Sequence, residues 1–196
     1  MGQKAYNLIQ AFFSSEEEGL RLLNSEPDLL SERTGLGETV LHYLVVENQL
    51  ASVQALVQKK GADINTLNDF GNSPLSEAAS LGYLDMINYL LSKGAKLKLP
   101  EQTDVVLHAA VRSNNVAVVK SVLNAGAAVN EIGELDETAL HLAAESSSPE
   151  IALVLIDAGA DIRARRIFDE TPLDVAQRSS SPETAEILRK AISKTS

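Results

Sequence analysis

Apolar residues follow a helical spacing in several stretches of this chain. In two stretches a pair of apolar residues is followed by a second pair about one helical turn later. These are Met86, Ile87, Leu90 and Leu91, and Val118, Val119, Val122 and Leu123. Such spacing predicts amphipathic helices. Pairs of small residues precede helical stretches of this kind, at Ala78-Ala79, Ala109-Ala110 and Ala143-Ala144. Because small side chains let neighbouring helices lie close, the pattern predicts an all-α fold of packed helix pairs.

The helical stretches recur at a fixed period. A Leu- or Val-rich stretch ends in glycine and alanine four times, with the glycines at Gly61, Gly94, Gly126 and Gly159, so that the steps are 33, 32 and 33 residues. A second marker begins at Thr39, Ser73, Val105, Thr138 and Thr171, with steps of 34, 32, 33 and 33 residues. Two independent markers with one shared period indicate a repeat protein.

Both markers suit helix ends. Thr39, Ser73, Thr138 and Thr171 are good N-caps, and Pro74 and Pro172 follow at the first helical position, where a missing N–H is not needed. The recurring glycines can end the second helices in a left-handed conformation. We therefore predict a positive φ at Gly94 and Gly126.

These markers resemble the ankyrin-repeat family, whose unit begins Thr-Pro-Leu-His and ends Gly-Ala-Asp-x-Asn. The resemblance covers about residues 34–190 and is weaker before them, and it implies an all-α solenoid of helix-turn-helix units joined by β-hairpin loops. The sequence departs from the family pattern where Val105 replaces threonine and where Ser76 and Asp174 replace histidine. We expect these departures to affect local detail and not the fold.

The repeats are expected to form one domain over residues 1–196. Residues 1–33 are interpreted as a degenerate N-terminal capping unit, 34–165 as four matching repeats, and 166–196 as a C-terminal capping repeat. Within the first unit, Ala5 to Phe13 can form one helix, and Ser15-x-x-Glu18 is typical of a capping box that opens a second helix. The charged stretch from Pro182 to Ile192 is expected to be the outer helix of the last unit, because an end repeat needs a polar face.

Composition narrows the function. The chain has 27 acidic and 17 basic residues, a formal net charge of −10, and no cysteine. Such acidity disfavours nucleic acid and anionic lipid and favours a basic protein partner, although it also serves solubility. The lack of cysteine excludes disulfides and thiolate chemistry. With no apolar run of membrane-spanning length, the expected location is the cytoplasm.

Catalytic and metal-binding residues are not predicted. The three histidines, His42, His108 and His141, occupy one repeat position, and in the family this residue makes hydrogen bonds that fix the hairpin between units. A metal site or a general base is the alternative. The cluster Arg163-x-Arg165-Arg166 is interpreted as a solvated hairpin, with phosphate binding or nuclear import as alternatives. We therefore expect no enzyme activity and no cofactor.

The resemblance also implies where a partner binds, since family members usually use the hairpin tips and the exposed face of the first helices. Placed on this chain, that surface includes three apolar residues at finger positions, Phe70, Leu135 and Phe168, which either anchor a partner or pack on the next hairpin. Its other members, mostly acidic, are Glu38, Glu47, Asp69, Asn72, Leu81, Tyr83, Glu101, Gln102, Asp104, Arg112, Glu134, Glu137, Glu145, Glu170 and Arg178.

The sequence thus predicts a protein-binding module that is a monomer when free and presents an acidic concave face to a basic partner. Two variants stay open. One is an inhibitor or immunity-type protein that neutralises a toxin or an enzyme. The other is a scaffold or a secreted bacterial effector.

Overall fold

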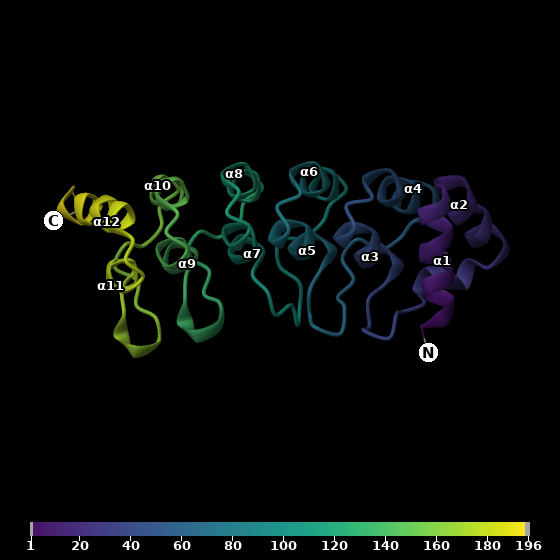
Figure 1. Ribbon diagram of the computed structural model, residues 1–196, viewed down its shortest axis with the longest axis horizontal. Coiled ribbons are helices and arrows are strands. Elements are labelled where there is room, and N and C mark those ends of the chain that lie inside the picture. The colour runs from purple at the N-terminus through teal and green to yellow at the C-terminus, as the bar shows by residue number, and fades with distance from the viewer. Residues whose placement is uncertain (1, 195–196) are drawn as a thin grey trace. The chain divides into compact units, whose positions relative to one another are not determined.

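The computed structural model describes residues 2–194, which form helix pairs in two compact units. The first unit runs to Thr103 and the second begins at Asp104 (Figure 1). The first helix of each pair, called the inner helix, is α1 (Gln3–Ser14), α3 (Val40–Val46), α5 (Pro74–Ser80), α7 (Val106–Arg112), α9 (Ala139–Glu145) or α11 (Pro172–Arg178). The outer helices are α2 (Glu16–Ser25), α4 (Leu50–Lys60), α6 (Leu84–Ser92), α8 (Val116–Asn124), α10 (Pro149–Asp157) and α12 (Pro182–Lys194). The predicted all-α repeat fold is confirmed.

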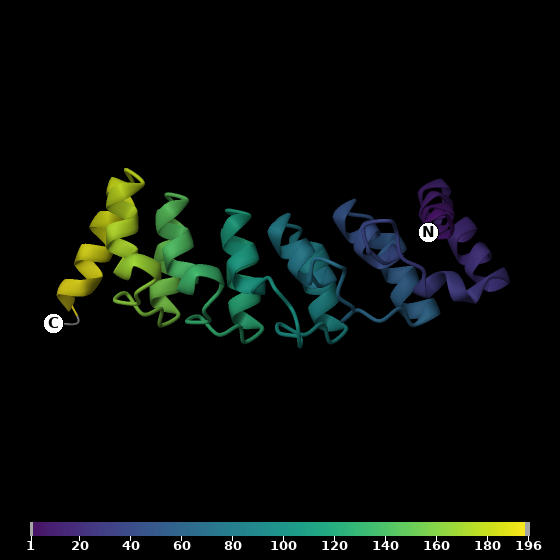
Figure 2. The same cartoon turned by 90° about the horizontal axis from the view of Figure 1, so that it is seen from below.

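Small residues form the contacts between inner helices, as the alanine pairs predict. Ala78, Ala79, Ala109 and Ala110 are fully buried, and in the second unit α7 packs on α9 and α9 on α11. The outer helices bury larger side chains, such as Met86 on α6. Each pair therefore joins an inner helix with small buried side chains to an outer helix with larger ones; Figure 2 shows the helices of each unit from below.

The first pair departs from this arrangement. Its helix α1 is seen along its length in Figure 1, where α3 and α5 are seen nearly end-on, and the relation is reversed in Figure 2. Helix α1 therefore crosses α3 instead of lying alongside it. The predicted cap is present nonetheless, since the Ser15 side chain accepts a hydrogen bond from the backbone N–H of Glu18 where α2 begins.

The inner helices begin with reciprocal hydrogen bonds between the N-cap and the third helical residue. Thr39 pairs with His42, and Thr138 with His141. Where histidine is replaced, Ser73 still pairs with Ser76, and Thr171 with Asp174. Hydrogen bonds from Thr171 lower the pKa of Asp174, because they stabilise its carboxylate. Ser76 and Asp174 thus keep the capping box where they replace histidine, whereas Val105 gives α7 no side-chain cap.

Short loops, called fingers here, join each repeat to the next. Four fingers are closed by one backbone hydrogen bond each, from Thr34 to Glu38, Asn68 to Asn72, Gly133 to Glu137 and Arg166 to Glu170. The described residues form no strand, and their one isolated bridge joins Arg33 to Thr39. The β-hairpins implied by the family resemblance are therefore not confirmed, since the fingers are tight turns without a strand ladder.

Two glycines near the ends of outer helices have the predicted left-handed backbone. The φ angles are 87° at Gly94 and 96° at Gly126. Nothing lies within 4 Å of a Cβ at either position, so the added Cβ has open space and the strain arises from the positive φ. Changing either glycine to valine should lower the free energy of unfolding by more than about 1 kcal/mol, as measured by urea denaturation.

A matched control is Gly35→Val, because Gly35 also has open space around its Cβ but no positive φ. That change should leave stability within about 0.5 kcal/mol of the parent. Equal losses at Gly35 and Gly94 would contradict the conformational explanation.

Candidate functional site

Four of the five fingers expose a large apolar side chain at the same repeat position. This residue lies three positions before the N-cap and is Leu36, Phe70, Leu135 or Phe168, with 57%, 61%, 62% and 85% of its surface exposed. Phe70 and Phe168 are therefore mostly exposed to solvent. The remaining finger has Gln102 here. Large apolar residues repeated at exposed turn tips are unlike the scattered exposed residues of an ordinary surface.

The backbone is strained at two of these tips. Leu135 and Asp136 both have a φ of 58°, and Phe168 and Asp169 both have a φ of 66°. Bulky non-glycine residues seldom take this conformation, and strain of this kind is concentrated at binding sites. The strained turns hold Leu135 and Phe168 outward.

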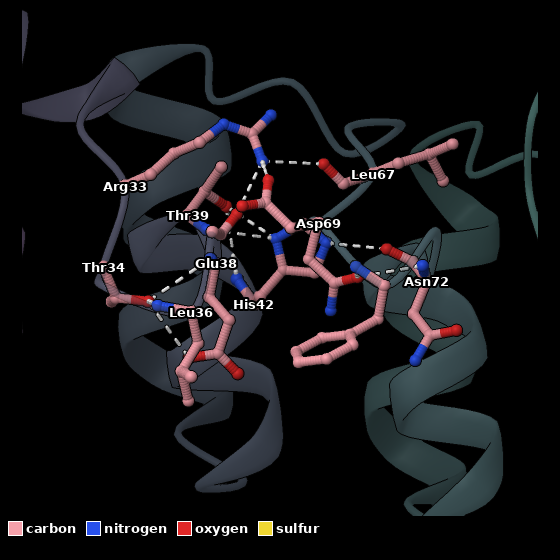
Figure 3. A network of polar contacts seen from close by, with 12 residues as sticks. Arg33, Thr34, Leu36, Glu38, Thr39, His42, Leu67, Asp69 and Asn72 are labelled. Atoms are coloured by element: carbon pink, nitrogen blue, oxygen red, sulfur yellow. Dashed lines mark hydrogen bonds and ion pairs between the residues drawn. The ribbon is translucent and has the colours of Figure 1, made fainter.

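A polar network fixes the first two fingers against each other (Figure 3). The Arg33 guanidinium donates to the backbone oxygens of Gly37, at 2.6 Å, and Leu67, at 2.9 Å, and lies 3.8 Å from the Asp69 carboxylate. Between them, Nε2 of His42 is 3.1 Å from the Asn72 backbone oxygen. The tips that carry Leu36 and Phe70 are thus preorganised, which lowers the entropy lost on binding.

The histidines make the hydrogen bonds that the family resemblance implies. His42 and His141 each use Nδ1 for the N-cap of their own helix, while His108 and His141 place Nε2 3.1 Å from the backbone oxygens of Glu131 and Glu170 in the following finger. Burial lowers the pKa of all three rings, so that they are neutral at pH 7. Within the described residues no group of three or more His, Asp or Glu side chains could hold a metal ion.

His42 should make stability depend on pH. Burial lowers its pKa to about 4 in the folded protein, whereas the unfolded chain has the ordinary value near 6.5. Between these values the unfolded state binds more protons, so stability is lost as the pH falls through this window. We expect a loss of about 2 kcal/mol between pH 7 and pH 5 from this one group.

Urea unfolding at pH 7 and pH 5 measures this loss. In His42→Gln the difference in stability between the two pH values should be much smaller, although the variant should be less stable than the parent at pH 7. An unchanged pH dependence in His42→Gln would rule out His42 as its source.

A second network lies in the second unit, around Arg166. Its side chain is 9% exposed, and its guanidinium lies 3.0 Å from Glu170, 3.7 Å from Glu137 and 4.0 Å from Glu145. Arg178 in turn lies 3.4 Å from Glu170 and 3.8 Å from Glu145. The interpretation of the arginine cluster as a solvated hairpin is therefore wrong for Arg166, because three carboxylates from two repeats enclose it. Sequence spacing alone does not show that these acids converge.

Ion pairs within the chain involve several of the acidic residues predicted to contact a partner. Asp104 forms an ion pair with Arg112, and Asp69 faces Arg33. Partial burial raises the pKa of Glu38 and of Glu137. The predicted acids that are exposed and outside the ion pairs of the described residues are Glu47, Glu101 and Glu134.

The other predicted site residues are also at the surface. Leu81 is 42% exposed, and the Tyr83 hydroxyl donates to the backbone oxygen of Val46 at 3.3 Å. The predicted set at the finger tips and along the inner helices has no buried member. We call these residues, with Leu36 added, the inner surface; some belong to the first unit and the others to the second. Leu36 was not predicted, although it lies three residues before the N-cap Thr39, as Phe70 lies before Ser73.

No helix of residues 2–194 combines the length and the apolar character that crossing a membrane requires.

Comparison with known proteins places these repeats in a family. The model of ankyrin repeats (3 copies) matches residues 7–101 and 107–196. The chain is 33% identical over 106 residues to the SMC5-SMC6 complex localization factor protein 1 of Bos taurus, across 50% of this chain and 10% of that protein. It is 35% identical over 108 residues to the nuclear factor NF-kappa-B p105 subunit of Rattus norvegicus, across 53% of this chain and 11% of that protein.

The chain spans about a tenth of the length of these relatives. The family model, in contrast, covers nearly all of this chain, and the structure consists of recurring helix pairs joined by fingers. The chain therefore belongs to the ankyrin-repeat family, whose repeats are protein–protein interaction modules.

Proposed function

We propose that this protein binds a basic partner protein through the inner surface. The observation that carries the proposal is the recurrence of an exposed Leu or Phe at the tip of four fingers, close in sequence to exposed carboxylates. Apolar anchors with a charged surround are the usual composition of a binding hot spot and its rim. The unpaired acids Glu47, Glu101 and Glu134 favour basic side chains in that surround.

The two hydrogen-bonded networks support this role. A preorganised surface loses little conformational entropy on binding, and both the His42 network and the Arg166 network hold neighbouring fingers in place. One relative, the SMC5-SMC6 complex localization factor protein 1, is named for its relation to a protein complex, which agrees with a binding role for such repeats.

The proposal predicts that Phe70→Ala combined with Phe168→Ala speeds dissociation of the partner at least about tenfold, since each ring is a potential anchor. The partner is first recovered by affinity capture and mass spectrometry, and its dissociation rate is then measured by surface plasmon resonance. Because both rings are exposed, the double variant should have the same urea midpoint of unfolding as the parent.

Leu153→Ala is the matched control, because Leu153 is also exposed, at 46%, but lies on the outer helix α10. It should leave the dissociation rate unchanged. A folded double variant that releases the partner at the parent's rate would refute the assignment of the finger tips.

A further inference from the structure

Three aromatic rings gather in the first unit, outside the predicted site. Tyr6 and Phe13 of α1 both contact Tyr43 of α3, with ring centroids 6.5 Å and 6.1 Å from that of Tyr43 and interplanar angles of 78° and 85°. Tyr6 is 39% exposed and Phe13 is 40% exposed. These rings, called the aromatic cluster, form a surface feature and not part of the core.

Helix α1 crosses α3, as Figures 1 and 2 show. This crossing brings Tyr6 and Phe13 to Tyr43. Tyr6 and Phe13 are seven residues apart, so they lie on one face of α1 about 10 Å from each other. The Tyr43 ring meets both edge to face.

Two acidic residues lie at the end of α3 and on the neighbouring helix α5. Glu47 follows Tyr43 by one helical turn, so both lie on one face of α3, and Glu47 is exposed. On the neighbouring helix α5, the repeat position of Tyr43 is occupied by Glu77, which accepts hydrogen bonds from the side-chain amides of Asn68, at 3.2 Å, and Asn72, at 3.0 Å. The guanidinium of Arg33 is directed to Asp69 and to the finger backbone. The charge near the aromatic rings thus favours a basic neighbour.

Resting on the proposed function, we propose that the aromatic cluster binds an extended, proline-containing segment of the partner that also has basic residues. A polyproline II segment rises about 3.1 Å per residue, so prolines three residues apart are separated by about 9 Å. This distance matches the spacing of Tyr6 and Phe13. Proline rings pack on aromatic side chains, and the free carbonyls of such a segment accept hydrogen bonds from tyrosine hydroxyls. Glu47 then pairs with a basic residue of the segment.

The test uses a synthetic peptide with two prolines three residues apart, followed by two arginines. A second peptide has alanine in place of both prolines. Each is titrated into the whole chain labelled with 3-fluorotyrosine, whose four tyrosines give separate fluorine NMR signals. The proline peptide should shift the signals of Tyr6 and Tyr43 but not that of Tyr89, which lies on the outer helix α6 beneath Lys93.

The alanine peptide should bind at least about fivefold more weakly, because it loses the ring contacts and the preformed extended conformation. Tyr6→Ala and Phe13→Ala should each weaken the proline peptide about tenfold. Tyr89→Ala should have no effect on its affinity. Circular dichroism checks that the variants are folded.

Equal affinity for the two peptides, or no shift at Tyr6 and Tyr43, would overturn the inference. The recovered partner separates this failure from that of the proposed function. If it binds Tyr6→Ala/Phe13→Ala as tightly as the parent but loses affinity for Phe70→Ala/Phe168→Ala, the aromatic cluster is not a binding site while the inner surface still is.

Discussion

Replacing Arg166 with alanine should lower the free energy of unfolding by about 2 to 3 kcal/mol, among the largest effects of any single change outside the core. The reason is that Glu137 and Glu170, whose side chains are 16% and 26% exposed, would keep their positions without a counter-charge. Breaking one partner of a buried ion pair leaves an uncompensated charge in a poorly solvated place. Urea denaturation at pH 7 measures the loss.

Arg165→Ala is the matched control, because Arg165 is the preceding residue but its side chain is 59% exposed and pairs only with exposed Asp169. It should change stability by less than about 0.5 kcal/mol. Adding Glu137→Gln to Arg166→Ala should restore part of the loss, since it removes one of the stranded charges. Equal effects of Arg165→Ala and Arg166→Ala would show that the Arg166 network does not stabilise the second unit.

The second large effect concerns association with the partner. Reversing Glu47, Glu101 and Glu134 to lysine should slow association about tenfold or more at low salt, because these acids are exposed and lie outside the ion pairs of the described residues. The dissociation rate should change less. The association rate of the parent should itself fall as salt screens the attraction.

A charge-matched control reverses Asp85, Glu150 and Asp157, which are exposed on outer helices. Both triple variants change the net charge of −10 by the same amount. Comparing them therefore distinguishes an effect of where the charges lie from an effect of the net charge. Equal slowing by both would mean that the partner responds to net charge and not to the inner surface.

The sequence predicted the repeats well because their signals are local and periodic. A glycine that ends an outer helix, or a threonine that caps an inner one, acts within a few residues, so that Gly94, Gly126 and Thr39 have the predicted roles in the structure. The helix ends of the degenerate first pair were predictable for the same reason. Its orientation was not, because the crossing of α1 over α3 is set by packing between units of unlike sequence.

The site was predictable only in outline. The position of a residue in the repeat predicted which residues are exposed, including Phe70 and Leu135. It did not predict which charged side chains form ion pairs with each other. Arg166 meets Glu137 from the preceding repeat, and Tyr43 meets Tyr6 from a differently oriented helix. Both contacts join residues far apart in the sequence, so no local pattern marks them.

The central claim is that a partner covers the inner surface and leaves the outer helices exposed. Since the chain has no cysteine, single cysteines can report this directly. Leu36→Cys and Leu135→Cys place one at finger tips, and Lys120→Cys and Asp157→Cys place one on exposed outer-helix positions. The rate of maleimide labelling is measured with and without saturating partner. The account predicts that the partner slows labelling at least about tenfold at both tips and leaves both outer-helix rates unchanged. Protection of the outer-helix cysteines with full reactivity at the tips would contradict it.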